Sequence, residues 1–142
     1  MSNNFLLTAG VFSFIASAAH IGIIIGGASW YRFFGAGEKM AVMAEEGKAY
    51  PHIITFFIAL VLTGFGLVAW SVAGILPSIP YSNMLLTLIT AIYLLRGILG
   101  FVAPFIDHPA TNENSTKFWL WSSGICTSIG IVHILGLIEL TN

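Results

Sequence analysis

Arg96 is the residue with the clearest chemical potential in this chain, because it lies within the mainly apolar segment 85–105. A charge at membrane depth is costly, so it normally pairs, faces a cavity or has a function. The position predicts a side chain too deep to snorkel fully to either interface. A permanent partner would be a helix carbonyl or one of Glu38, Asp107 and Glu139. Because guanidinium binds carboxylate and phosphate bidentately, a ligand is equally consistent with the sequence.

Two histidines, His20 and His133, also lie within apolar stretches. Counting about 1.5 Å per residue places His20 near the depth of Arg96 and His133 about 10 Å away. Two histidines at one level could hold a haem iron axially, whereas two at different levels could not share it. Alternatively, each histidine bonds a serine or a backbone carbonyl between packed helices.

A second group of possible metal ligands lies in or beside the polar connections, and consists of Glu38, His52, Asp107 and His108. Histidine and carboxylate side chains could hold zinc or another divalent ion. Their spacing matches no metal motif, which favours polar interface residues instead. Nucleophile-elbow, phosphate-loop, dinucleotide and CxxC motifs are also absent from the sequence, which leaves the question of an enzyme open and favours a protein that is not one.

The composition indicates an integral membrane protein. Of 142 residues, 57% are hydrophobic and only 8% are charged, against about 25% charged in soluble domains. The net charge of -1 offers no basic surface for nucleic acid. The single Cys126 excludes an internal disulfide. The length suits one transmembrane domain, residues 1–142.

Four segments are long and apolar enough to span a bilayer, at about 5–27, 53–76, 84–105 and 118–140. Their apolar residues run continuously, which favours helices over a β-barrel. The fold class is therefore all-α, an integral membrane four-helix bundle. Between the first two spans, residues 38–48 predict a short interfacial helix, with a solvated loop as the alternative.

The first span carries a face of small residues, Ala18, Gly22 and Gly26, spaced four apart. This spacing lets two helix backbones approach closely, so it could seat a partner helix or a second copy of the chain.

Positive residues predict the orientation of the bundle. Arg32, Lys39, Lys48 and Lys117 all flank one side, which predicts that both termini face outward.

Three segments carry a resemblance to known proteins: SWYRFFGAGE at 29–38, YLLRG at 93–97 and FWLWSS at 118–123. Together they resemble a group of small four-span bacterial inner-membrane proteins of uncharacterised function. The overall layout is similar to that of DoxX-like membrane proteins. The resemblance implies a multi-pass protein of the bacterial inner membrane, and it implies no activity.

The sequence supports three functional hypotheses. The first is a membrane-embedded binding protein for a small amphiphile such as a lipid or quinone, with Arg96 as anion anchor, His20 beside it and the pocket mouth at 31–38. The second is a haem-binding or redox subunit that uses His20 and His133. The third is a non-catalytic structural or assembly subunit. The candidate ligand-binding residues are Arg96, His20, His133, Tyr93, Tyr31, Arg32 and Glu38.

Overall fold

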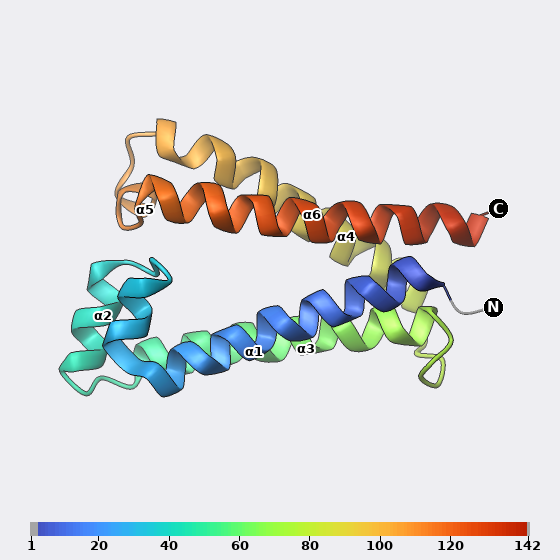
Figure 1. Ribbon diagram of the computed structural model, residues 1–142, viewed down its shortest axis with the longest axis horizontal. Coiled ribbons are helices and arrows are strands. Elements are labelled where there is room, and N and C mark those ends of the chain that lie inside the picture. The colour runs from blue at the N-terminus through green and yellow to red at the C-terminus, as the bar shows by residue number, and fades with distance from the viewer. Residues whose placement is uncertain (1–2, 142) are drawn as a thin grey trace.

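The computed structural model describes residues 3–141, without the side chain of residue 110, and helices are the only regular secondary structure in that range (Figure 1). Four long helices dominate, and each is long and apolar enough to cross a membrane. They are α1 (Asn4–Phe33), α3 (Tyr50–Val72), α4 (Ser82–Val102) and α6 (Thr116–Thr141). The short helices are α2 (Glu38–Glu45), η1 (Ala103–Phe105) and α5 (Pro109–Asn112).

The predicted fold class is confirmed, including the short helix between the first two spans. The predicted single domain of residues 1–142 includes three terminal residues that lie outside the described range. Helix α3 begins at Tyr50, three residues before the predicted start, because Pro51 suits the first turn of a helix. It ends at Val72 instead of Leu76, and Gly74 follows with a φ of 83°.

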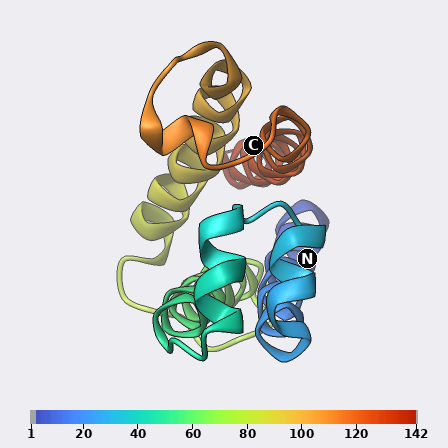
Figure 2. The ribbon, with the colours of Figure 1, turned by 90° about the vertical axis from the view of Figure 1, so that its left-hand side faces the viewer.

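The first span differs from its prediction at Gly27, where it was expected to end. The chain bends sharply there and then continues as helix to Phe33. Gly27 has φ 62° and ψ -149°, a conformation that is essentially restricted to glycine. As a result, residues 28–33 and α2 fold across one end of the α1–α3 pair, which we call the α2 end (Figures 1 and 2). Both termini lie at the opposite, terminal end (Figure 1).

The four spans associate as two pairs, α1 with α3 and α4 with α6 (Figure 1). In the first pair, Ser17 Oγ donates to the Ala59 carbonyl at 2.8 Å and lies 2.9 Å from Thr63 Oγ1. In the second pair, Gly97 and Gly100 leave room for Thr127 and Ser123. Small residues and buried hydroxyls are what bring helices together in lipid, so each pair is tightly joined internally.

The two pairs are joined to each other mainly in the terminal half of the bundle. Asn3 Nδ2 donates to the Gly136 carbonyl at 2.8 Å, and the hydroxyls of Ser13 and Tyr93 lie 2.9 Å apart. Toward the α2 end the pairs diverge (Figure 1). There the α1–α2 connection bridges them, because Gly35 packs against Phe118.

The conformation of Gly27 generates a test of the bend. Replacing Gly27 by Ala should lower the stability of the protein by about 1–3 kcal/mol, because a Cβ is strained at this φ and ψ. Apart from the neighbouring backbone, no described atom lies within 4 Å of the position that the Cβ would occupy, so the effect would come from the backbone alone. Thermal unfolding in detergent measures it.

Gly64→Ala is the matched control, since Gly64 also has open space but lies within helix α3. Alanine favours helix over glycine, so this variant should be as stable as the wild type or more stable. Equal melting temperatures for Gly27→Ala and Gly64→Ala would contradict the assigned strain.

Candidate functional site

The Arg96 side chain extends along α4 toward the α2 end. Its Nη2 donates to Ser122 Oγ at 3.0 Å, and its Cζ lies 5.0 Å from the centroid of the Trp119 ring. Its Nη1 lies beside Gly100, one turn further along α4, where a Cβ would overlap it. The guanidinium is therefore held between α4 and α6 by a hydroxyl and an aromatic face, a cation–π arrangement.

This direction brings the guanidinium toward the ends of α4 and α6 at the α2 end. Trp119 is three residues from the start of α6, and Gly100 is five residues from the end of η1. At 1.5 Å per residue, the charged group is about 5–8 Å from the ends of these helices. The side chain thus follows the α4–α6 contact for about a turn, in the manner of a snorkelling arginine, and Trp119 lies near the start of α6, where interfacial tryptophans are common. That Arg96 is too deep to reach either interface fully stays a prediction.

The guanidinium of Arg96 has no carboxylate partner in residues 3–141. The salt bridges found there join Arg32 to Glu38 and Glu45, and Lys48 to Glu46. Asp107, one of the partners considered from the sequence, instead accepts a hydrogen bond from Asn112 Nδ2 at 2.8 Å. The Arg96 charge is therefore balanced by no acid of the described chain.

Three buried polar atoms in the α4–α6 contact also lack a hydrogen bond, and they are Arg96 Nη1, Ser123 Oγ and Thr127 Oγ1. The first two both adjoin Gly100, and the third adjoins Gly97. Leaving a buried donor or acceptor unpaired typically costs about 1–3 kcal/mol. The pair of helices thus keeps a strip of unused hydrogen-bonding capacity next to the guanidinium.

His133 and Tyr93 form a second polar cluster, closer to the middle of the bundle. His133 is fully buried, and its ring centroid lies 5.4 Å from that of Tyr93. Its Nδ1 lies 2.9 Å from the Ile129 carbonyl and must carry the proton, because a carbonyl only accepts. The Nε2 of the neutral ring is then an acceptor, and it has no partner. Tyr93 bonds Ser13, so the cluster joins the two helix pairs.

His20 lies at a different level from His133. It follows Ser13 by seven residues on the same face of α1, and Ser13 contacts Tyr93, which stacks on His133. Seven residues of helix correspond to about 10 Å, so the two imidazoles are offset along the bundle. His20 Nδ1 lies 2.7 Å from the Ala16 carbonyl. One haem iron could not be ligated by both histidines.

The predicted mouth residues lie at the α2 end, where they hold α2 in place. The buried Tyr31 hydroxyl lies 3.1 Å from Thr55 Oγ1 and 3.3 Å from His52 Nδ1. Arg32 is bonded by both Glu38 and Glu45 at 2.6 Å, on the exposed surface. These hydrogen bonds from the Arg32 guanidinium lower the pKa of both carboxyl groups. The mouth residues are not in contact with Arg96 in any interaction found among the described residues.

The candidate metal ligands His52, His108, Asp107 and Glu38 are not brought together. Among the described residues, no group of three or more His, Cys, Asp or Glu side chains could hold a metal ion. His52 instead lies against Tyr31, and Glu38 is bound to Arg32.

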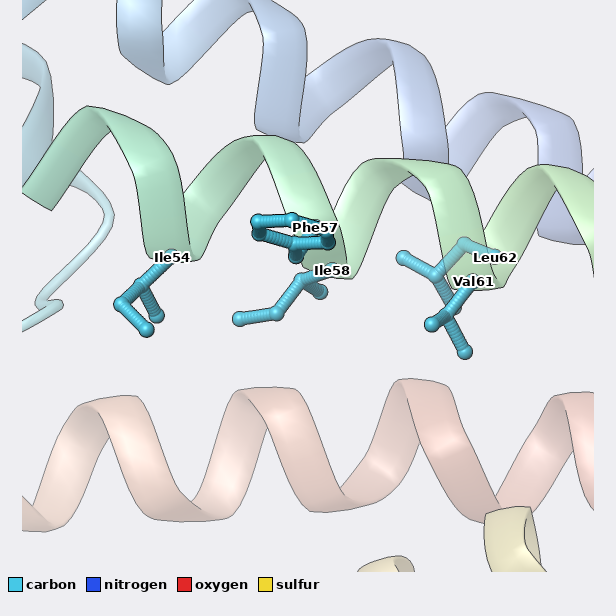
Figure 3. Close-up of a pocket in the computed structure, with 5 residues that line it drawn as sticks. All are labelled: Ile54, Phe57, Ile58, Val61 and Leu62. Atoms are coloured by element: carbon cyan, nitrogen blue, oxygen red, sulfur yellow. The ribbon is translucent and has the colours of Figure 1, made fainter.

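An apolar groove of about 280 Å³ lies on the surface of α3, and sequence reasoning missed it. The groove is lined by Ile54, Phe57, Ile58, Val61 and Leu62. A second, polar depression of about 240 Å³ is lined by Arg32 and Glu38 together with residues of the two connections at the α2 end. Figure 3 shows Ile54, Ile58 and Val61 pointing from α3 toward α6, across the space where the pairs diverge. The only sequence signal for this groove is the helical spacing of apolar residues such as Ile54 and Ile58. Helices that face lipid show the same pattern.

The groove begins near the α2 end of α3. Ile54 is four residues from the start of α3, or about 6 Å from the α2 end of that helix. From Ile54 to Leu62 the groove extends about 12 Å along the helix by the same rise. At its far end, Leu62 packs against a buried cluster of Ile89, Tyr93 and Ile129. The groove and the Arg96 guanidinium therefore both lie toward the α2 end, the groove on α3 and the guanidinium between α4 and α6.

The small face of α1 is partly covered by the chain itself. The Trp30 indole lies beside Gly22 and Gly26, so that a Cβ on Gly26 would overlap it. A partner helix would dock beside Ala18 or displace the indole. Sequence reasoning missed this contact because Trp30 follows Gly27 and was assigned to the loop.

Comparisons with known proteins identify no relative. No family model, no curated protein and no solved structure matches the chain.

The carboxyl groups of Glu38 and Glu45 generate a prediction about pH. Their pKa values in the folded protein lie below the ordinary value of about 4.3, so their contacts stabilise α2 above that pH. The stabilisation should disappear as the pH falls through the lowered pKa values. Amide hydrogen exchange in α2, corrected for the intrinsic rate, should therefore accelerate between about pH 5 and pH 3.

Arg32→Gln is the control, because it removes the common partner of both carboxylates. In this variant the exchange of α2 should be faster at neutral pH and lose the acid-induced step. An unchanged step would show that Arg32 is not its origin.

Proposed function

We propose that this chain is a multi-pass membrane protein that binds a small amphiphile, with the tail in the α3 groove and the head near Arg96. The observation that carries the proposal is the guanidinium of Arg96, which has no carboxylate partner among the described residues and lies, like the groove, toward the α2 end. Binding is favoured over catalysis because the sequence contains none of the catalytic motifs considered above.

The tail would be hydrocarbon, since all five side chains that line the groove are apolar. Ligand sites commonly measure about 300–1,000 Å³, so a cavity of about 280 Å³ suits a small or slender molecule. Because the two helix pairs diverge beside it, the ligand would enter sideways from the bilayer.

The head would lie at the α2 end, where Arg96, Ser122 and Trp119 meet. A guanidinium supplies five N–H donors, and the hydrogen bond found here, to Ser122, uses one of them. His20 would lie at similar depth, since both residues are displaced from Tyr93 toward the α2 end. His133 and Tyr93 would close the far end of the site.

The location proposed is the inner membrane of a bacterium, with both termini outside. Arg32, Lys39, Lys48 and Lys117 all belong to the α2 end, and positive residues are retained in the cytoplasm. The resemblance to small bacterial inner-membrane proteins favours the same location. The ligand head would then be drawn from the cytoplasmic leaflet.

The groove is tested by filling it. Ile58→Trp should place an indole in the space and lower the amount of amphiphile that co-purifies with the protein, measured by native mass spectrometry. Leu60→Trp is the matched control, since Leu60 is 49% exposed on the same helix and does not line the groove. Equal amphiphile content in the two variants and the wild type would overturn the proposed site.

A further inference from the structure

We infer that residues 28–34, which we call the 28–34 segment, anchor the α2 end of the protein in the membrane interface. The partner is lipid, at the boundary between the headgroups and the acyl chains. The anchor goes beyond the proposed function, because it uses neither the α3 groove nor Arg96. It follows from the direction of the segment, the sorting of its side chains and the charge around it.

The direction of the 28–34 segment suits a position in the plane of the membrane. The long helices run mainly along the long axis of the molecule, and Gly27 turns the chain across that axis at the α2 end (Figures 1 and 2). The helix that follows, up to Phe33, therefore lies along the surface of a bilayer that the spans cross. A helix in this position meets lipid on one side and polar surroundings on the other.

One face of the 28–34 segment is a cluster of exposed aromatic rings. Trp30, Phe33 and Phe34 share this face, since they are three and four residues apart. The ring centroids of Trp30 and Phe34 are 5.9 Å apart, and those of Phe33 and Phe34 are 5.2 Å apart. Phe33 is 83% exposed, and the other two rings are exposed in part. An exposed apolar cluster of this kind marks an interaction surface.

The aromatic cluster is continuous with the apolar surface of α1. The Trp30 indole lies back along that helix, over Gly26 and Gly22. Ile25, which lies between these glycines in the sequence, is 82% exposed on a helix that is apolar enough to cross a membrane. The indole therefore extends from the segment toward the acyl chains, as interfacial tryptophans commonly do. This continuity identifies lipid as the partner that covers the cluster.

The other side chains of the 28–34 segment bind the protein itself. Tyr31 is buried, and its hydroxyl lies 3.1 Å from Thr55 Oγ1. Arg32 is bonded to Glu38 and Glu45 of α2. The segment thus presents aromatic rings on one face, while its polar groups hold α3 and α2. This division between an apolar and a polar face is the one that an interfacial helix requires.

Helix α2 is attached to the anchor and does not supply it. Ala41 is fully buried in a cluster with Ile23 and Tyr31, so the apolar face of α2 packs mainly against the protein. Charge does not draw this region to the membrane either, because residues 32–48 contain three basic and three acidic side chains. The attachment to lipid therefore depends on the aromatic rings, and it should be independent of anionic lipid.

The test measures the depth of a spin label on the full chain in phosphatidylcholine vesicles. Cys126→Ala removes the single native thiol, and Phe33→Cys or Phe34→Cys then carries the label. Val42→Cys on α2 is the matched control, since Val42 is 38% exposed and Phe34 is 39% exposed. Power-saturation EPR compares the access of oxygen, which concentrates in lipid, with that of a water-soluble nickel complex. Thermal unfolding verifies that each labelled variant is folded.

The labels at Phe33 and Phe34 should be several-fold more accessible to oxygen than to nickel. The label at Val42 should show the reverse, because α2 is held by the protein on the polar side of the segment. Vesicles that contain phosphatidylglycerol should give the same depths, since the region carries no net charge.

Four outcomes would contradict the inference. Labels at Phe33 and Phe34 that nickel reaches more readily than oxygen would place the segment in water. Labels that neither reagent reaches would mean that a second copy of the chain, or another protein, covers the cluster instead of lipid. Insertion of Val42 to the same depth would assign the anchor to α2 as well. Insertion that requires phosphatidylglycerol would show that charge, and not the aromatic face, attaches the segment.

Discussion

The structure depends on how few groups can hold helices together in a bilayer. Lipid gives apolar helices little reason to associate, so contact is made where small residues and buried polar side chains coincide. In this chain most of those groups serve the α1–α3 and α4–α6 pairs, through Ser17 in one and Gly97 and Gly100 in the other. Few remain to join the pairs, and these, including Ser13 and Tyr93, lie in the terminal half. The divergence of the pairs, and the apolar groove beside it, follow from that distribution.

Gly27 determines what happens at the open end. Its backbone conformation turns the chain out of the direction of α1, so that residues 28–33 and α2 lie across the end of the pair. Tyr31 then bonds Thr55, and Gly35 meets Phe118, which ties the folded segment to both helix pairs. The groove is therefore bounded at the α2 end by this segment and at the other by the packing around Tyr93. A straight first helix would leave the pairs without this second connection.

Much of the fold could be predicted because the signals are long and redundant. Four apolar stretches and one charged segment at 38–48 suffice for the spans and for α2. The bend at Gly27 could not be predicted, because glycine permits many backbone conformations and the sequence does not say which one is used. The direction of Arg96 depends on α6 lying beside α4, which no local pattern encodes. The groove was missed for a similar reason, since Ile54 and Ile58 would be apolar facing lipid or a cavity.

The position of Arg96 changes the balance between its two interpretations. A structural ion pair requires a carboxylate, and the acids considered from the sequence do not pair with Arg96: Glu38 is bound by Arg32, and Glu139 forms no salt bridge in the described chain. A charge that served only to reach the interface could be any cation. Trp119 against its face and Ser122 on its edge instead orient a planar group, which lysine would not offer. The contacts of Arg96 therefore orient its guanidinium between α4 and α6 without neutralising its charge, which favours a role other than a structural ion pair.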